Sequence, residues 1–384
     1  MGFMGYERPD GSVGVRNYVA VISTVACANS VVNAIARAVP EVKAITHTEG
    51  CGRGPADVLM SSRTLIGLCK NPNVAALLIV SLGCEVIKPE FIESGIGEAG
   101  KPMEILSIQH EGGSVKSVQK GAEIARKLVE STRAMERKEF EWAKLTVGLE
   151  CGGSDAMSGV TANPMVGVAA DWLVGEGGTV IISETTEMIG TEEILAKRAA
   201  NAEVAKEIMQ LIKNQEKLTK EILGPMADMV ISPGNMDGGL STIKEKSLGC
   251  IIKGGTTAIQ QVLDYGEAPL KKGLVIMDTP GSDIFSLTGM AAGGAQVMIF
   301  TTGRGTPAGF PVVPVIKVAS NTEIFEKMND DMDLNAGRIL EGVPMEEAGR
   351  SLIELFQKVA AGQKTKAEIN LNDVLAIHTV GPSF

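Results

Sequence analysis

The chain has 384 residues, more than a single hydrophobic core usually fills, so we expect about two domains. Its net charge of −10 at pH 7 and its pI near 5.1 argue against nucleic acid or an anionic membrane surface as a partner. Because no stretch approaches the ~20 apolar residues of a membrane span and the first residues do not resemble a signal peptide, we expect a cytoplasmic protein with reduced cysteines.

Apolar runs alternate with helical segments in the first third of the chain. The expected strands are 17–26, 42–47, 74–82 and 103–108, and the expected helices are 28–38, 56–70, 88–99 and 114–136. This alternation is typical of a largely parallel sheet covered by helices, with right-handed crossovers. The charged stretch 131–144 is expected to be helical and to link two units, an N-terminal unit of residues 1–135 and a C-terminal unit of residues 136–384.

The second unit repeats the same alternation. Its expected strands are 145–150, 179–183, 273–278, 296–301 and 312–318, and its expected helices are 163–176, 191–222 and 345–363. The predicted fold class is therefore α/β: two α/β units with largely parallel sheets. Ligands of such sheets bind outside the carboxyl ends of the strands, so we place the active site there.

Four cysteines come just after apolar runs that read as buried strands. They are Cys27, Cys51, Cys84 and Cys151. Because the carboxyl ends of parallel strands meet at one edge, this pattern indicates a shared site. Thiolates in such a crevice suit a soft metal, either a lone iron or zinc ion or an iron–sulfur cluster.

A second interpretation is that the four cysteines are small buried hydrophobic residues. We expect this role for the other two cysteines of the chain, Cys69 and Cys250. Two of the four, however, lie in glycine-rich turns with little core to fill. Cys151 is a separate case because it opens the sequence CGGSD. That loop would place a thiol, backbone N–H groups, Ser154 and Asp155 around one substrate group.

Glycine-rich loops recur between the elements and are suited to binding carboxylates or phosphates. The stretch GRGTPA at 303–308 imitates a dinucleotide fingerprint. Phe310, Pro311 and Pro314 follow where the helix of that motif should begin, so nicotinamide binding is not expected.

Several longer motifs together carry a family resemblance. They are GYERPDGSVGVRN at 5–17, HTEGCG at 47–52, NPNVAALLIVSLGCE at 71–85, CGGSDAMSGVTANPMVG at 151–167 and PGNMDGGLSTIKEKSLG at 233–249. In this order, and over nearly the whole chain, they resemble the altronate and galactarate dehydratase family. The large subunit of sulfolactate sulfo-lyase is similar to that family as well.

The resemblance implies a metal-dependent hydro-lyase that dehydrates a sugar acid, D-altronate, to a 2-keto-3-deoxy acid. The alternatives are a galactarate dehydratase, the large subunit of a sulfolactate sulfo-lyase, or, in another class, a sugar-acid-binding subunit of a two-component complex. Single-chain members carry a small β-rich domain ahead of the first motif. We therefore expect a small β-rich (SAF-like) subunit as partner, and a homo-oligomer.

The resemblance also implies iron as the cofactor. Cys27, Cys51 and Cys84 would hold it as Fe²⁺ or as a [4Fe–4S] cluster with one iron open to the leaving hydroxyl, and Mn²⁺ is the alternative metal. The proton α to a carboxylate is too weakly acidic for an unaided side chain, so the enolate needs cationic stabilisation.

His47 is the first candidate for proton transfer because it follows the second strand and precedes Cys51. The alternative is an ordinary hydrogen-bonded histidine. Asp155 and Glu184 follow strands, and we assign them catalytic roles beside His47, although isolated carboxylates there more often cap loops. The carboxylate of Glu187 is suited to proton transfer or to metal ligation as well.

The remaining candidates are expected to bind substrate through cations, hydroxyls and exposed backbone N–H groups. Arg304 suits a carboxylate best because its guanidinium is forked, whereas Lys246 has the alternative of being a solvated helical residue. Asn163 is expected to cap a helix that begins at Pro164. The full substrate-binding set is Arg16, Cys151, Gly152, Gly153, Ser154, Ser158, Thr161, Asn163, Asn235, Lys246 and Arg304, with Lys317 as a further cation.

Overall fold

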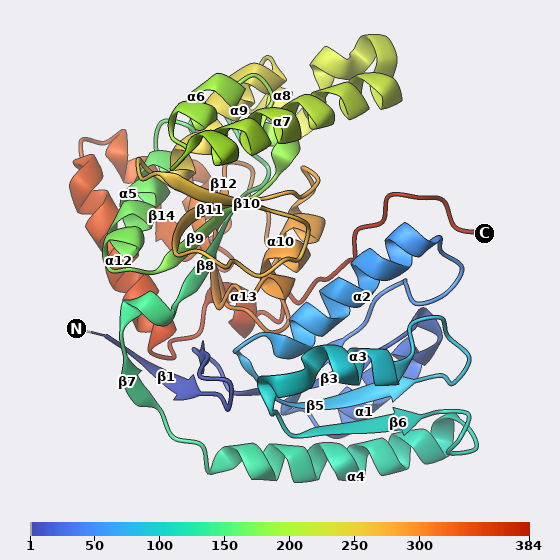
Figure 1. Cartoon of the computed structure of the whole chain (residues 1–384). Helices are drawn as coiled ribbons and strands as arrows, with labels where there is room; N and C mark the ends of the chain where they lie inside the picture. The colour runs from blue at the N-terminus through green and yellow to red at the C-terminus, as the bar shows by residue number, and fades with distance from the viewer. Residues whose placement is uncertain (1) are drawn as a thin grey trace.

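The computed structural model describes residues 2–384, apart from the side chains of Glu98, Asp228 and Met229. Strands β3 to β6 form one parallel sheet (Figure 1). The order is β4-β3-β5-β6. Helices cover both faces. These elements are β3 (Tyr18–Ser23), α1 (Asn29–Ala38), β4 (Val42–Ile45), α2 (Pro55–Lys70), β5 (Val74–Ser81), α3 (Pro89–Ile96), β6 (Met103–Ser107) and α4 (Ser114–Arg133).

Alternate residues of β3 explain the layering of this small sheet. Val19 and Val21 pack with α1 and α4, whereas Ala20 and Ile22 pack with α2 and α3. All eight residues of β5 are buried, as expected for an inner strand with both faces covered. β3 ends at Ser23, earlier than expected, because residues 24–28 turn away and form a short 3₁₀ helix that carries Cys27.

The second sheet is larger and entirely parallel, with the order β10-β11-β9-β8-β12-β13-β14. The chain leaves β8 on one side to form β9 and later returns to form β12 on the other side. Where the strand order of a parallel sheet reverses in this way, a crevice opens beyond the carboxyl end of the strand at the reversal. In this sheet that strand is β8. The strands are β8 (Thr146–Cys151), β9 (Thr179–Ile182), β10 (Ile259–Leu263), β11 (Gly273–Met277), β12 (Val297–Thr302), β13 (Val315–Ala319) and β14 (Leu334–Asn335).

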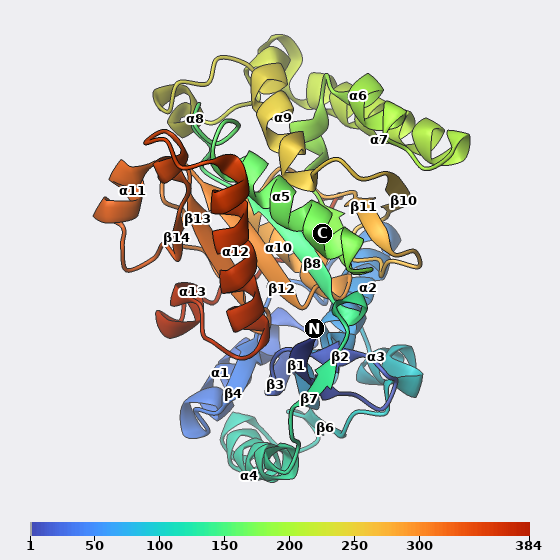
Figure 2. The ribbon, with the colours of Figure 1, turned by 90° about the vertical axis from the view of Figure 1, so that its left-hand side faces the viewer.

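Helices cover the large sheet on both faces and across its carboxyl edge (Figures 1 and 2). One face packs against α5 and α12, and the other against α10. The expected helix 191–222 is two helices, α6 and α7, separated around Arg198–Asn201. The helices of this lobe are α5 (Ala162–Gly175), α6 (Glu192–Lys197), α7 (Ala202–Leu223), α8 (Pro233–Asp237), α9 (Ile243–Ile251), α10 (Asp283–Ala292), α11 (Thr322–Lys327), α12 (Met345–Ala360) and α13 (Lys366–Ile369).

The expectation of a helical link at 131–144 is wrong beyond Arg133. Residues Lys138–Phe140 form strand β7, which pairs antiparallel with β1 (Phe3–Glu7), and β1 pairs with β2 (Val13–Gly14). Aromatic packing explains this sheet, because the ring centroids of Phe3 and Trp142 lie 5.5 Å apart. Residues from both sides of the expected boundary therefore share one sheet.

Two buried asparagine side chains join the small sheet to the large one. Asn71 donates from Nδ2 to the carbonyl oxygens of Ala291 and Ala295, both at 2.9 Å. Asn73 donates from Nδ2 to Gln296 O at 2.8 Å and to Val312 O at 2.9 Å. The NPN sequence at 71–73 is therefore a structural junction. In the part of the chain that the structure describes, no helix is both long and apolar enough to cross a membrane.

Candidate active site

The four cysteines expected at one site belong to two different sheets. Cys27, Cys51 and Cys84 are exposed on loops beyond the carboxyl ends of β3, β4 and β5. Cys151 ends β8 of the large sheet and is buried. The carboxyl edge of the large sheet lies at the top of Figure 1, whereas the small sheet lies at the bottom. The structure therefore places Cys151 on a different sheet from the three exposed thiols.

Backbone hydrogen bonds tie the three exposed cysteine loops together. Ala26 N donates to Glu49 O at 3.0 Å, and Val86 N donates to Gly50 O at 3.1 Å. Gly50 adopts a φ of +111°, and a side chain there would collide with Thr24 O, so only glycine permits this approach. Among the described residues, the three sulfur atoms do not form a set that lies wholly within 4.8 Å.

His47 lies beside these loops, but both nitrogens of its ring are already engaged. Nε2 lies 2.7 Å from Ser23 O, and Nδ1 accepts from Glu49 N at 3.1 Å. The side chain is buried, and burial lowers the pKa of His47. These contacts hold a neutral imidazole that joins the ends of β3 and β4, and they leave no ring nitrogen for a substrate.

Arg16 is also committed elsewhere. Its guanidinium forms a buried bidentate pair with Glu368, with Nε–Oε1 at 2.7 Å and Nη2–Oε2 at 2.9 Å. Its remaining donors bond the carbonyl oxygens of Val15, Val359 and Gln363. The expectation that Arg16 clamps a substrate carboxylate is therefore wrong, because every donor group of its fork has a protein partner.

The CGGSD loop continues β8 into the crevice of the large sheet. A side chain at Gly152 would collide with the Asp283 carboxylate, and Gly153 has a φ of +59°. Both glycines are therefore required by the path of the loop. Beyond them, the Ser154 hydroxyl lies 2.9 Å from Cys151 Sγ, so the thiol and the hydroxyl lie together as expected.

Asp155 is fully hydrogen-bonded and holds the loop in place. Its Oδ1 accepts from Ser158 N, Ser158 Oγ and Ser320 Oγ, each at 2.8 Å. Its Oδ2 accepts from Asn321 Nδ2 at 3.0 Å. Because both of its oxygens accept from protein donors, this carboxylate has a positioning role rather than the expected proton-transfer role.

Four further residues of the substrate-binding set form hydrogen bonds in and around the same loop. Asn163 lies within α5 rather than capping it, accepts from Thr301 Oγ1 at 2.7 Å, and has Nδ2 3.6 Å from Cys151 Sγ. Asn235 Nδ2 donates to Ser154 O at 2.9 Å, and Thr161 Oγ1 donates to Ser320 O at 2.6 Å. Arg304 is exposed, and its backbone N donates to Gly153 O at 2.9 Å.

A buried ionic network lies directly behind Cys151. Lys253 Nζ is 2.8 Å from Glu184 Oε2 and 3.0 Å from Cys250 Sγ, and the Cys151 backbone N donates to the same Glu184 oxygen at 3.2 Å. Glu184 has a φ of 67°, a strained conformation for a residue with a side chain. A strained backbone conformation persists only where the surrounding structure enforces it. Such conformations are concentrated at functional sites.

The network perturbs the acidity of its members. A hydrogen bond from Cys250 lowers the pKa of Cys151 to about 6, and Lys253 adds to this effect against the opposing effect of burial. The pKa of Cys250 is raised by that hydrogen bond and by burial. Burial and the neighbouring Glu150 raise the pKa of Glu184 well above its ordinary value. The hydrogen bond from Cys250 and the charge of Lys253 thus favour the thiolate form of Cys151.

A cavity of about 260 Å³ opens beside this thiol. Cys151, Ser154, Asn163 and Lys246 line it, together with the loop at 155–160 and residues of α9. Lys246 pairs with Glu187 in a buried ion pair, and although burial opposes its charge, Glu187 and Glu184 raise its pKa. The alternative that Lys246 is a solvated helical residue is therefore wrong.

Sequence reasoning missed several members of this site. Cys250 was expected to be an inert hydrophobe, but it contacts Lys253. Cys250 is in the last turn of α9 and Lys253 is three positions later, in the 3₁₀ turn Ile252–Gly254, a spacing that predicts neighbours on one helical face. Lys317 is buried with its Nζ 3.1 Å from the centre of the Phe300 ring, and burial lowers its pKa to about 7. It does not line the cavity.

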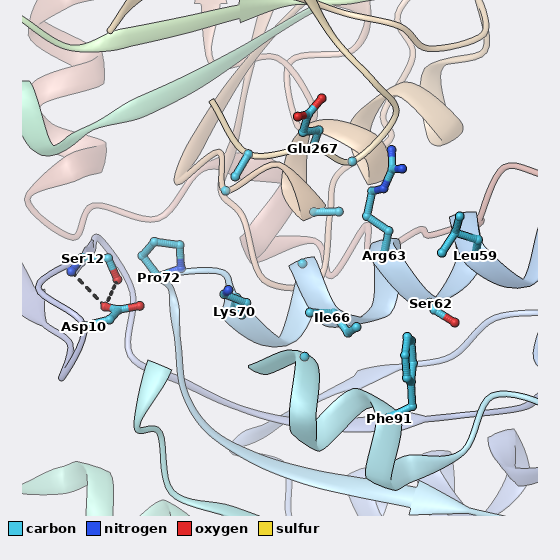
Figure 3. Close-up of a pocket in the computed structure, with 16 residues that line it drawn as sticks. Asp10, Ser12, Leu59, Ser62, Arg63, Ile66, Lys70, Pro72, Phe91 and Glu267 are labelled. Carbon is cyan, nitrogen blue, oxygen red and sulfur yellow. Dashed lines mark hydrogen bonds between the residues drawn. The ribbon is translucent and has the colours of Figure 1, made fainter. Parts of the chain in front are cut away.

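A larger cavity of about 550 Å³ lies elsewhere, between α2, α3 and the loop that follows β10 (Figure 3). Leu59, Ile66, Pro72 and Phe91 give it mainly apolar walls. It contains none of the site residues expected from the sequence. The smaller cavity is the better candidate for the active site because the polar side chains of Cys151, Ser154 and Lys246 converge on it.

Comparisons with known proteins agree with the resemblance seen in the motifs. Residues 142–383 match the family model described as D-galactarate/altronate dehydratase, C-terminal, and residues 5–133 match the model described as D-galactarate dehydratase/altronate hydrolase, second domain. Altronate dehydratase of Bacillus subtilis (strain 168) is 35% identical over 391 residues, which cover 99% of this chain and 78% of that protein.

Two other relatives are named for different activities. Galactarate dehydratase (L-threo-forming) of Escherichia coli (strain K12) is 37% identical over 99% of this chain and 77% of that protein. The (2R)-sulfolactate sulfo-lyase subunit beta of Chromohalobacter salexigens is 33% identical over 95% of this chain and 94% of that protein. On these matches, the chain belongs to the D-galactarate/altronate dehydratase family and is a carbon–oxygen lyase.

Proposed function

We propose that this chain dehydrates a sugar acid, D-altronate, to a 2-keto-3-deoxy acid in the 260 Å³ cavity at the end of β8. The observation that carries the proposal is the position of the Cys151 thiol, which lines this cavity with Lys246 and Asn163, lies 2.9 Å from Ser154 Oγ, and has its pKa lowered by the hydrogen bond from Cys250. Galactarate is the second candidate substrate because a galactarate dehydratase is 37% identical to this chain.

In this proposal, the Cys151 thiolate takes the proton α to the substrate carboxylate. A general base works best when its pKa is near the working pH, and this thiol meets that condition. The Lys246 ammonium lines the same cavity, where it binds the carboxylate and stabilises the negative charge that develops on it. Ser154 and Asn163 supply hydrogen bonds to the substrate hydroxyls. The hydroxyl on the next carbon leaves as water with the proton that Cys151 removed, and the resulting enol becomes the 2-keto acid.

We infer that the thiols of Cys27, Cys51 and Cys84 hold an iron–sulfur cluster. Three exposed sulfur donors on loops joined by backbone hydrogen bonds fit such a group. Among the described residues they are too widely spaced for one small ion, whereas each thiolate of a cluster binds a different iron. A thiol set does not suit Mn²⁺. Iron bound there supplies a Lewis acid.

We further propose that the protein assembles with a small β-rich (SAF-like) subunit and forms a homo-oligomer. The sulfolactate relative is named as a subunit beta, which supports an assembly with more than one kind of subunit. Co-expression of the chain with such a subunit, followed by size-exclusion chromatography and a turnover assay, tests this assembly. Full activity of this chain alone would contradict the need for the partner.

A panel of aldonates and aldarates, assayed for 2-keto-3-deoxy product, tests the proposed reaction. We expect D-altronate to give the highest kcat/KM and Cys151→Ala to abolish turnover while substrate still binds. Sulfite release from sulfolactate would assign the chain to the other relative's chemistry. Binding of sugar acids without any keto acid, with and without a partner subunit, would favour a binding subunit instead.

A further inference from the structure

Two cysteine side chains from distant segments meet at the wall of the proposed substrate cavity. Cys151 ends β8, and Cys250 lies in the last turn of α9. Both are buried free thiols, and their Sγ atoms lie within 4.8 Å of one another. We call Cys151 and Cys250 the thiol pair.

Close packing of α9 against the loop after β8 brings the thiol pair together. A Cβ atom at Gly159 would lie 2.8 Å from Gly249 Cα, closer than a side chain allows, so glycine is required at this crossing. Gly249 directly precedes Cys250 in the chain. Its carbonyl oxygen accepts from Asn163 Nδ2 at 2.9 Å, and the same Nδ2 lies 3.6 Å from Cys151 Sγ. One amide therefore contacts both of the segments that carry the thiols.

The two thiols differ in their access to small molecules. Cys151 lines the 260 Å³ cavity, so a small oxidant that enters the cavity reaches its sulfur, whereas Cys250 is not among the described residues that line it. Peroxides oxidise the thiolate form of cysteine, and the hydrogen bond from Cys250, together with Lys253, lowers the pKa of Cys151. The site thus offers an accessible reactive thiol with a second thiol beside it.

Oxidation of Cys151 would prepare Cys250 to react. The hydrogen bond with Cys151 and then burial raise the pKa of Cys250, whereas Lys253, whose Nζ lies 3.0 Å from Cys250 Sγ, lowers it. A Cys151 sulfur that has gained a hydroxyl no longer carries the thiolate charge. The largest cause of the raised pKa is then removed, and the lysine charge remains next to Cys250.

We propose that the thiol pair is an oxidative modification site, in which a hydroperoxide oxidises Cys151 and Cys250 then closes a reversible disulfide bond with it. In the first step, Cys151 Sγ attacks one peroxide oxygen and the O–O bond breaks. The other oxygen takes up the proton that Cys151 has lost and leaves as an alcohol or as water, and Cys151 becomes a sulfenic acid.

The second step joins the two sulfur atoms. Cys250 Sγ attacks Cys151 Sγ, the S–O bond breaks, and the hydroxyl leaves as water with the thiol proton of Cys250. Two thiols have then lost two electrons, and one hydroperoxide has gained them. The Sγ atoms of a disulfide bond are about 2.05 Å apart, so both side chains must rotate toward one another. A dithiol reductant reverses the reaction by thiol–disulfide exchange.

The disulfide bond would switch off the reaction proposed above. This consequence rests on the proposed function, since a Cys151 sulfur that is bonded to Cys250 cannot take a proton from a substrate. Formation of the bond does not depend on that function. Cys250 would also protect Cys151, because a sulfenic acid that condenses with a thiol does not go on to the irreversible sulfinic acid.

Mass spectrometry of the full-length chain tests the linkage directly. After a molar equivalent of hydrogen peroxide and blocking of the remaining thiols, a non-reduced digest should contain the Cys151 peptide joined to the Cys250 peptide. Dithiothreitol should release both. Cys250→Ser should give no linked peptide and should accumulate Cys151 sulfinic acid instead. Cys69→Ser, at a buried cysteine of α2 outside the thiol pair, is the matched control and should form the linked peptide normally.

Two results would overturn the proposal. One is a Cys151 that stays reduced under peroxide, and the other is a Cys151 that becomes a sulfinic acid in the unmodified chain without any linked peptide. Both are measured on the unmodified chain, so they decide the proposal even if Cys250→Ser does not fold.

Turnover distinguishes this proposal from the proposed function. After peroxide, dithiothreitol should restore at least about tenfold more turnover to the unmodified chain than to Cys250→Ser, whose Cys151 is irreversibly oxidised. Both proteins carry the exposed thiols of Cys27, Cys51 and Cys84, so oxidation of those thiols affects both equally. A linked peptide with undiminished turnover would support the modification site and contradict Cys151 as the base. Absence of the linked peptide would overturn the modification site alone.

Discussion

The Lys253 ammonium lies 2.8 Å from the Glu184 carboxylate, in an ion pair whose side chains are 2% and 0% exposed. The same ammonium lies 3.0 Å from Cys250 Sγ. One lysine therefore links the end of α9 to the segment after β9, directly behind Cys151. The pair matters for the stability of the fold mainly because removal of either partner would leave the other as a buried, uncompensated charge.

Removal of one partner of this pair should be strongly destabilising. We expect Lys253→Met to lower the free energy of unfolding by about 3–5 kcal/mol, measured by urea denaturation, because Glu184 would stay buried without its cation. The double variant Lys253→Met, Glu184→Gln should recover part of the loss. Lys217→Met, which breaks an exposed pair with Glu221, is the matched control and should leave stability unchanged. An equal loss in single and double variants would contradict this explanation.

The acid limb of the pH–rate profile should report Cys151. The thiolate is the proposed base, so kcat/KM should rise with pH through about 6, the pKa that the hydrogen bond from Cys250 gives this thiol. Cys151→Ser should reduce kcat by about 10²–10⁴-fold, because a serine hydroxyl stays protonated. Cys250→Ala should move the acid limb to higher pH. An unchanged acid limb in Cys250→Ala would exclude Cys151 as the titrating group.

Stability should fall on acidification because of His47. Burial lowers its folded-state pKa below the ordinary value of 6.5. The unfolded chain therefore binds more protons than the folded chain below pH 6.5, and stability decreases as the pH falls from that value. His47→Gln should flatten this dependence in urea melts and keep most of the turnover. His110→Gln, at an exposed site, should not change the slope. Complete loss of turnover in folded His47→Gln would restore the catalytic assignment.

Arg16 offers a clear test of structural against substrate-binding roles. Its buried bidentate pair with Glu368 predicts that Arg16→Met lowers the free energy of unfolding by about 3–5 kcal/mol while leaving KM within a few-fold. Glu368→Gln should destabilise less because it keeps part of the hydrogen bonding. A large rise in KM with unchanged stability would instead show that Arg16 binds substrate.

Iron content tests the thiol loops. Protein purified without oxygen should contain iron and acid-labile sulfide, and Cys27→Ser, Cys51→Ser and Cys84→Ser should each lower both, because each removes one thiolate donor. Cys69→Ala, which alters a buried cysteine of α2, is the control and should keep the iron. Stoichiometric iron in the triple serine variant would contradict the assignment.

Much of the fold follows from local sequence patterns. The run 74–82 is uniformly apolar, and β5 is indeed buried on both faces, while β8, β9, β11 and β12 also occur where apolar runs predict them. The edge strands β10 and β14 escaped prediction because β14 has only two residues and two glutamines interrupt the apolar run of β10. The strand β7 escaped because its stability comes from pairing with β1, far away in the sequence.

The sequence by itself determined which residues stand at the carboxyl ends of strands, because an apolar run shows where its strand stops. Cys151 and Ser154 were located in this way. Only the tertiary structure decided which partners meet them. It placed Cys250 of α9 and Lys253 of the 3₁₀ turn after α9 next to Cys151, and it engaged His47 with backbone groups. Helix packing over a sheet edge and side-chain hydrogen bonding depend on segments that are distant in the chain, so no local pattern specifies them.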